Sequence, residues 1–150
     1  MSRACPLLLT MLVLAACGRP PANEVDSEVT SLGTVEVSAQ LVEIPGAFPA
    51  NDLYNYAYVL KYRVLQVHRG QVAEREILVG QYNPLKPRAA AQDDGSGKVG
   101  GRLDAFRAGE VHRMALDAPL DQFWMGGIID KYFEQKGVRY WAVWTNPGTK

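Results

Sequence analysis

The sequence predicts an all-β fold, a small antiparallel barrel of five to six strands, preceded by a signal peptide and a flexible tether. Five or six runs rich in Val, Ile, Tyr and Trp alternate apolar with polar residues, as strands do. Helix signals are few. The second and longest run changes its apolar face partway along, which is typical of the bulged or coiled strands of barrels. A small sandwich is the alternative, but a closed barrel leaves no exposed strand edge.

Residues 1–16 are predicted to be the signal peptide of a bacterial lipoprotein. Arg3 gives a positive start, and the apolar run at 6–16 is too short to span a bilayer as a helix. The run leads into LAAC at 14–17, which resembles the lipobox, in which small residues precede an obligatory cysteine. The resemblance implies that the Cys17 thiol takes a diacylglyceryl group and that the chain is cut before it. An ordinary secretory signal is the alternative.

A lipid at Cys17 would hold the protein on a membrane. Each buried CH₂ contributes about 0.8 kcal/mol, so two or three acyl chains make a firm anchor. Gly18 follows the cysteine where the inner-membrane retention signal has Asp, so the resemblance implies the outer membrane, facing the periplasm. Because Cys5 lies in the signal peptide, Cys17 is the only cysteine of the mature chain, and the domain is expected to fold without disulfides.

The mature chain divides into two parts by composition. Residues 17–31 are polar, contain Pro20 and Pro21, and show no sustained apolar period, which predicts a flexible, lipidated tether. Residues 32–150 are predicted to form the β-barrel domain, since a chain of this size buries enough surface for one core.

The stretch 54–82 organises the domain. It reads as two long strands joined by a hairpin loop near residues 68–70. In the first of these strands the apolar residues switch parity between Val64 and Leu65, which predicts a bulge or a strong coil at this point.

The remaining strands of the first two thirds follow from alternation. A strand is expected at 34–44, before the hairpin, and another at 109–116. In the second strand of the hairpin, Ile77 and Val79 face the core in one register and Leu78 in the other.

Residues 83–101 form the longest stretch without a strand or helix pattern. We expect a solvated loop, and also a candidate contact surface, because loops on a rigid scaffold often carry recognition. Asp93 and Asp94 before Gly95 invite a calcium-loop interpretation, but the longer EF-hand array ending in Glu is missing. Neither a metal site nor a cofactor is predicted.

Residues 120–133 are ambiguous between helix and strand. An apolar stripe at helical spacing favours a helix, but Gly126 and Gly127 lower helix stability by about 1 kcal/mol each. The alternative is a final hairpin that pairs 128–133 with the last strand at 138–145.

No catalytic constellation is found in the sequence, and an enzyme is not predicted. His68 and His112 are each followed by Arg, and neither has a recognisable acid or nucleophile beside it. They also lack a third ligand with zinc spacing. The 16 basic and 16 acidic residues balance and are scattered, so nucleic-acid binding is not predicted either.

Four aromatic residues form the candidate binding surface: Tyr54, Tyr56, Trp124 and Trp141. Aromatic rings stack on sugar faces and also anchor protein interfaces. The alternative, that these rings fill the core or pair across strands, stays open at this point.

Of the small barrels, the OB-like fold fits best. Residues 62–70, YRVLQVHRG, and 76–80, EILVG, resemble the core hairpin of netrin-like and tissue-inhibitor-like OB domains, which have Lys-Gly at the turn where this chain has Arg69-Gly70. The chain is more similar to small exported bacterial proteins associated with alginate-type polysaccharide O-acetyltransferases. In these proteins such a hairpin precedes a Gly-x-x-His-Arg-x-x-Leu strand, matched here by GEVHRMAL at 109–116.

The second resemblance implies a non-catalytic accessory of surface polysaccharide synthesis or modification, with a polysaccharide or an envelope acyltransferase as partner. The first implies a protein–protein interaction or inhibitory module in the periplasm. The two differ in the surface they need. A grooved aromatic surface would favour a glycan, and a flat apolar patch would favour a protein.

Overall fold

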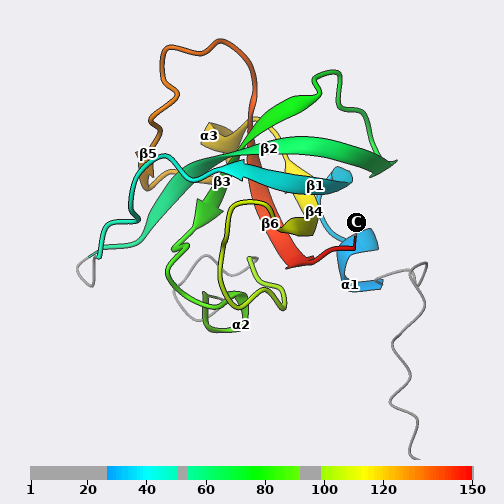
Figure 1. The fold of residues 1–150 in the computed structure, drawn as a ribbon, viewed down its shortest axis with the longest axis horizontal. Coiled ribbons are helices and arrows are strands. Elements are labelled where there is room, and N and C mark those ends of the chain that lie inside the picture. Colours follow the sequence, from blue (N-terminus) through cyan, green and yellow to red (C-terminus); the bar gives the residue numbers. More distant parts are fainter. Residues whose placement is uncertain (1–26, 51–53, 92–98, 150) are drawn as a thin grey trace, which may run out of the picture.

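The computed structural model describes residues 27–50, 54–91 and 99–149. Its nine elements, in chain order, are α1 (Ser27–Thr30), β1 (Val35–Glu43), β2 (Tyr56–Arg69), β3 (Glu76–Tyr82), α2 (Arg88–Ala91), β4 (Val111–Asp117), α3 (Leu120–Phe123), β5 (Gly127–Ile129) and β6 (Arg139–Pro147). Figure 1 shows the strands wrapped around one another. The short helix α1 lies beside the strands, and α2 lies below them in this view. Strands dominate, as the sequence predicts.

Five strands close into a barrel. The hydrogen-bonded order is β1-β4-β6-β3-β2, and β2 pairs again with β1. The β3–β6 pairing is parallel, and the other four pairings of the barrel are antiparallel. β5 is the extra strand and lies parallel to the start of β2. The predicted OB-like barrel is confirmed, in a mixed form.

The long strand β2 pairs with two different strands along one of its edges. Its first residues pair with β5, and its second half pairs with β1. Ser38 pairs with Gln66 and Ala39 with Val64, so Leu65 lies in a bulge, which confirms the irregularity predicted where the apolar parity switches. The side chain of Leu65 is 50% exposed, however. The apolar residues that follow the parity switch therefore do not form a second buried face of β2.

The barrel interior is filled from alternate positions of the strands. The main core cluster includes Val37, Leu41, Leu60 and Met114, none of which is exposed to solvent. β3 is buried on both sides, so the two registers considered for it are both partly right. Ile77 and Val79 face this core, and Leu78 packs with Val59 and Tyr132 in a separate cluster.

The described parts of the stretch after β3, residues 83–91 and 99–101, are more buried than the solvated loop expected from the composition. α2 lies within it, and Arg88 on α2 is only 2% exposed. The Arg88 guanidinium donates to the carbonyls of Asn83 and Lys86 at 2.7 and 3.0 Å and lies 5.0 Å from the ring centre of Phe106. The described part of 83–101 therefore closes one end of the barrel. The stretch 93–95, for which a calcium loop was considered and not predicted, lies outside the described residues.

The ambiguous region 120–133 contains both a helix and a strand, each short. The final hairpin considered for it is wrong, because β5 pairs with β2 and not with β6. α3 packs against the sheet at Gly80, where a Cβ would lie 1.9 Å from Leu120 Cδ1. Glycine at this position of β3 thus makes the close approach of α3 possible.

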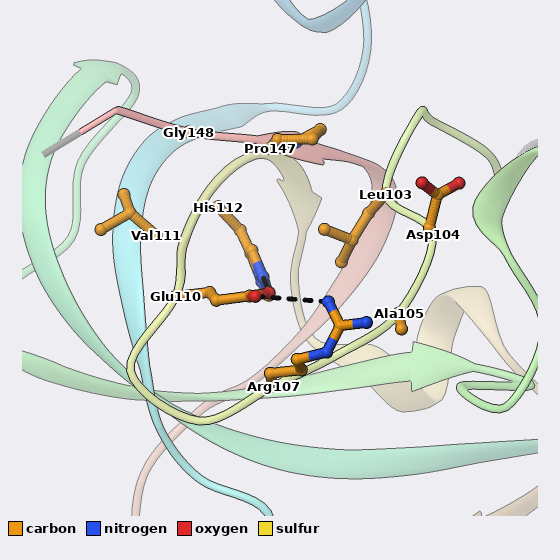
Figure 2. Close-up of a pocket in the computed structure, with 9 residues that line it drawn as sticks. All are labelled: Leu103, Asp104, Ala105, Arg107, Glu110, Val111, His112, Pro147 and Gly148. Atoms are coloured by element: carbon orange, nitrogen blue, oxygen red, sulfur yellow. Dashed lines mark hydrogen bonds and ion pairs between the residues drawn. The ribbon is translucent and has the colours of Figure 1, made fainter.

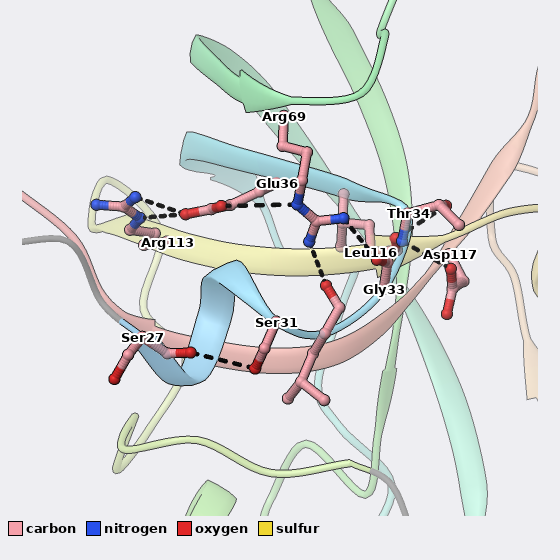
Figure 3. Close-up of polar contacts among 10 residues, drawn as sticks. Ser27, Ser31, Gly33, Thr34, Glu36, Arg69, Arg113, Leu116 and Asp117 are labelled. Carbon is pink, nitrogen blue, oxygen red and sulfur yellow. Dashed lines mark hydrogen bonds and ion pairs between the residues drawn. The ribbon is translucent and has the colours of Figure 1, made fainter.

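An ionic cluster holds α1 to the barrel (Figure 3). Glu36, 1% exposed, accepts two hydrogen bonds from Arg113 at 2.8 and 2.5 Å, and Arg69 Nε lies 4.0 Å from its other oxygen. Arg69 in turn donates to the carbonyls of Leu32 and Gly33 just after the helix. Since Val29 is fully buried, the last residues of the expected 17–31 tether pack on the fold.

Candidate functional site

The four aromatic residues singled out in the sequence lie close together. Tyr56 is the first residue of β2 and Tyr54 lies two residues before it, with their ring centres 6.3 Å apart. Trp124, just after α3, stacks on Trp141 of β6 with ring centres 5.6 Å apart and an interplanar angle of 7°. The backbone of β5 joins the two pairs, because Gly127 pairs with Tyr56 in the sheet and accepts a hydrogen bond from Trp124 Nε1 at 3.0 Å.

Most of this aromatic surface faces inward. Tyr56 is 2% exposed and donates its hydroxyl to the Pro49 carbonyl at 2.9 Å. Trp141 is 5% exposed, and Tyr82 packs edge-on against both indoles. Trp124 is half-buried over Gly126, where a Cβ would meet the indole at 2.3 Å. Of the four residues, only Tyr54 is largely exposed, at 60%.

Three exposed apolar side chains beside these rings were not expected from the sequence. Phe123 and Met125 flank Trp124, and Ile128 lies on β5 opposite Ala57. We call these three residues, together with Tyr54 beside Gly127 of β5, the apolar rim: Tyr54, Phe123, Met125 and Ile128. Met125 is 90% exposed. The sequence signal was the run FWMGGII, whose two glycines break any regular element and leave the apolar side chains without a common buried face.

A separate pocket lies at the start of β4. It is an open hollow of about 320 Å³ between the segment before β4 and the end of β6. Figure 2 shows the His112 imidazole pointing toward Glu110 and Arg107, while Leu103 and Pro147 form part of the wall. His112 is fully buried, and no motif around it in the sequence predicts its place at a pocket.

The second histidine lies elsewhere. His68 is exposed near the end of β2, and its Nε2 is 2.8 Å from the Ser38 hydroxyl. The structure therefore does not bring the two histidines into one site. Among the described residues no group of three or more His, Cys, Asp or Glu side chains is arranged to hold a metal ion.

The lipid-attachment residue Cys17 lies outside the described residues. Within them, no helix has the length and apolar character needed to cross a membrane. Comparison of the chain with protein-family models, with curated proteins and with solved structures finds no match.

Proposed function

We propose that this protein is a lipoprotein of the bacterial envelope, anchored through Cys17 to the outer membrane and facing the periplasm, that works by contact and not by catalysis. Its partner is an envelope enzyme of surface polysaccharide synthesis or modification, such as an acyltransferase. The anchor rests on the lipobox at 14–17, and the link to polysaccharide rests on the resemblance of the strands around Tyr62 and His112.

The apolar rim is the observation that carries the contact function. Exposed apolar side chains that gather at one place mark interaction surfaces in soluble domains. Since the two indoles stack on each other and Trp141 is buried, their faces are not free to stack on a sugar ring. What remains exposed is Tyr54, Phe123, Met125 and Ile128, a surface that suits a protein partner better than a glycan.

The placement of the rim supports the same conclusion. β5 lies at the first residues of β2, whereas Arg69 at the last residue of β2 contacts the segment after α1. Figure 1 shows α1, where the tether would enter, and β5 on opposite sides of the barrel. An anchored domain would thus present the rim away from the point at which its tether arrives.

The test is a charge placed in the rim. Met125→Glu should reduce cross-linking of the protein to an envelope partner in intact cells, because a desolvated carboxylate is costly in an apolar interface. Acetylation or yield of the surface polysaccharide should fall with it. The melting temperature should not change, since Met125 is 90% exposed.

Leu65→Glu is the matched control, because Leu65 is also an exposed apolar residue, 50% exposed, but lies in the second half of β2. It should behave as the wild type. If Met125→Glu leaves both cross-linking and polysaccharide at the level of this control, the rim is not the contact surface.

A further inference from the structure

The pocket at the start of β4 contains a buried polar atom without a hydrogen-bond partner in the described part of the chain, Nε2 of His112. Its nearest charged group is the Glu110 carboxylate, 3.9 Å away, which is beyond hydrogen-bond distance. Buried polar atoms in folded proteins are nearly always paired, so an unpaired one at a pocket wall points to a partner from outside the chain.

The hydrogen bond at the other ring nitrogen, Nδ1, determines whether Nε2 is a donor or an acceptor. The buried Tyr62 hydroxyl lies 3.1 Å from Nδ1 of His112. Burial lowers the pKa of His112 to about 4, so the ring is neutral near neutral pH. We assign the phenol as the donor to Nδ1, and the neutral ring then carries its own proton on Nε2. His112 therefore presents one N–H donor toward the pocket.

The charges around this donor favour a neutral ligand. Arg107 and Glu110 form an ion pair at 3.3 Å, and Asp104 adds a second carboxylate to the lining. The Arg107 and Glu110 charges offset each other, and Asp104 leaves the lining with a net negative charge that repels an anion. The ion pair offers a donor beside an acceptor, an arrangement that matches adjacent neutral hydroxyls. The volume of about 320 Å³ lies at the lower end of small-molecule sites, which limits the ligand to a small group.

We propose that this pocket binds one ring of a neutral sugar. Adjacent hydroxyls of a sugar ring both donate and accept, so one can accept from the Arg107 guanidinium while its neighbour donates to the Glu110 carboxylate. A third oxygen of the sugar, either a hydroxyl or the ring oxygen, accepts from His112 Nε2. The apolar walls formed by Leu103, Val111 and Pro147 contact the C–H face of the ring.

Access to Nε2 requires a movement of one side chain. The Glu110 carboxylate is too close to His112 for an oxygen atom to fit between them, but the Glu110 side chain is 41% exposed and can shift aside. A sugar oxygen then takes its place at Nε2, while the displaced carboxylate still accepts from the neighbouring hydroxyl at the pocket edge. The site is independent of the apolar rim, because none of its lining residues belongs to the rim. It adds direct glycan recognition to the proposed function and does not depend on a protein partner.

The experiment uses the mature lipidated protein in a phosphocholine detergent, because maltoside detergents are themselves sugars. The probes are methyl glucoside, methyl mannoside and N-acetylglucosamine, with glucuronate as the anionic comparison. Saturation-transfer NMR measures binding, and the ¹⁵N resonances of the His112 ring report the site. At least one neutral probe should bind and shift Nε2, and glucuronate should bind more weakly.

Two residues outside the core, the exposed Arg107 and the partly exposed Glu110, test the assignment. Arg107→Ala and Glu110→Gln should each weaken binding about tenfold, because a hydrogen bond to a charged group contributes about that factor. The matched controls Arg75→Ala and Glu74→Gln change the same charges on the exposed β2–β3 connection and should leave binding unchanged.

Three results would overturn the proposal. One is that no neutral probe shifts Nε2 of His112. Another is that glucuronate binds more tightly than the neutral sugars, which would make the ligand class wrong. The third is that the Arg107 and Glu110 variants bind as well as their controls. None of these readouts depends on cross-linking through the rim, so the failure of either proposal is distinguishable from that of the other.

Discussion

His112 makes the stability of the domain depend on pH. Its ordinary pKa is 6.5, and burial lowers the pKa to about 4 in the folded protein, with Glu110 opposing the shift. Between these pH values the unfolded chain binds more protons than the folded one. The free energy of unfolding therefore has its full value above pH 6.5, where His112 is neutral in both states, and it decreases as the pH falls toward 4. The loss is about 3 kcal/mol at most.

Replacing His112 should remove this dependence. His112→Gln keeps a polar partner for Tyr62 but cannot titrate, so its free energy of unfolding should change less than that of the wild type between about pH 6.5 and about pH 4. Urea unfolding at several pH values measures the slope. His68→Gln is the control, since His68 is exposed, and it should keep most of the wild-type slope. An unchanged slope in His112→Gln would mean that carboxylates elsewhere cause the acid sensitivity.

Two glycines allow a neighbouring side chain to approach the backbone closely, because they lack a Cβ atom. Gly80 leaves room for Leu120 of α3 on the sheet, and Gly126 lets the Trp124 indole fold over the backbone. From the sequence, Gly80 is expected to weaken a strand, and Gly126 is expected to lower the stability of a helix. Their common role depends on contacts with side chains that come from other parts of the chain or from a neighbouring turn.

At the scale of elements, α1 is held in place by one arginine. Four residues are too few for a helix to be stable alone, so α1 depends on Val29 in the core and on the contacts of Arg69 with the carbonyls after it. Arg69 Nε also lies 4.0 Å from Glu36 of β1, which accepts hydrogen bonds from Arg113 of β4. The contacts of α1 are therefore connected to both strands.

Removing the guanidinium should loosen this element. Arg69→Met keeps the aliphatic stem and should lower the free energy of unfolding by about 1–3 kcal/mol, because two partly buried carbonyls lose a charged donor. Hydrogen exchange should increase first in the amides of α1. Arg75→Met, on an exposed residue after β2, is the control. Equal stability and equal exchange in the two variants would show that α1 is held by Val29 alone.

At the scale of the whole molecule, the proposal requires that anchoring and folding are separate. Cys17→Ser should leave the protein unprocessed or free of lipid, and detergent phase partitioning should move it from the detergent phase to the aqueous phase. The unfolding transition should remain, because the barrel core is built from residues after 28. A Cys17→Ser protein that is processed and partitions like the wild type would disprove the lipid anchor.

The strands and the small barrel can be predicted from the sequence alone. Alternation of apolar and polar residues has a period of two and is local, so β1, β2, β4 and β6 were found close to their observed ends. The bulge at Leu65 was visible for the same reason, as a change of parity within one strand. The candidate aromatic residues were also named from sequence, but whether they were core or surface stayed open.

The way in which those elements meet depends on long-range contacts, which the local pattern does not contain. The pairing of β5 with β2 joins Ile128 to Ala57, and three residues are too few to show a period of their own. The stacking of Trp124 on Trp141 and the position of Arg88 in the barrel end also depend on contacts between distant segments. The pocket of His112 joins the segment before β4 to the end of β6. Local pattern specifies which face of a strand is apolar, but the energy of long-range packing selects which side chains end up buried together and which remain at the surface.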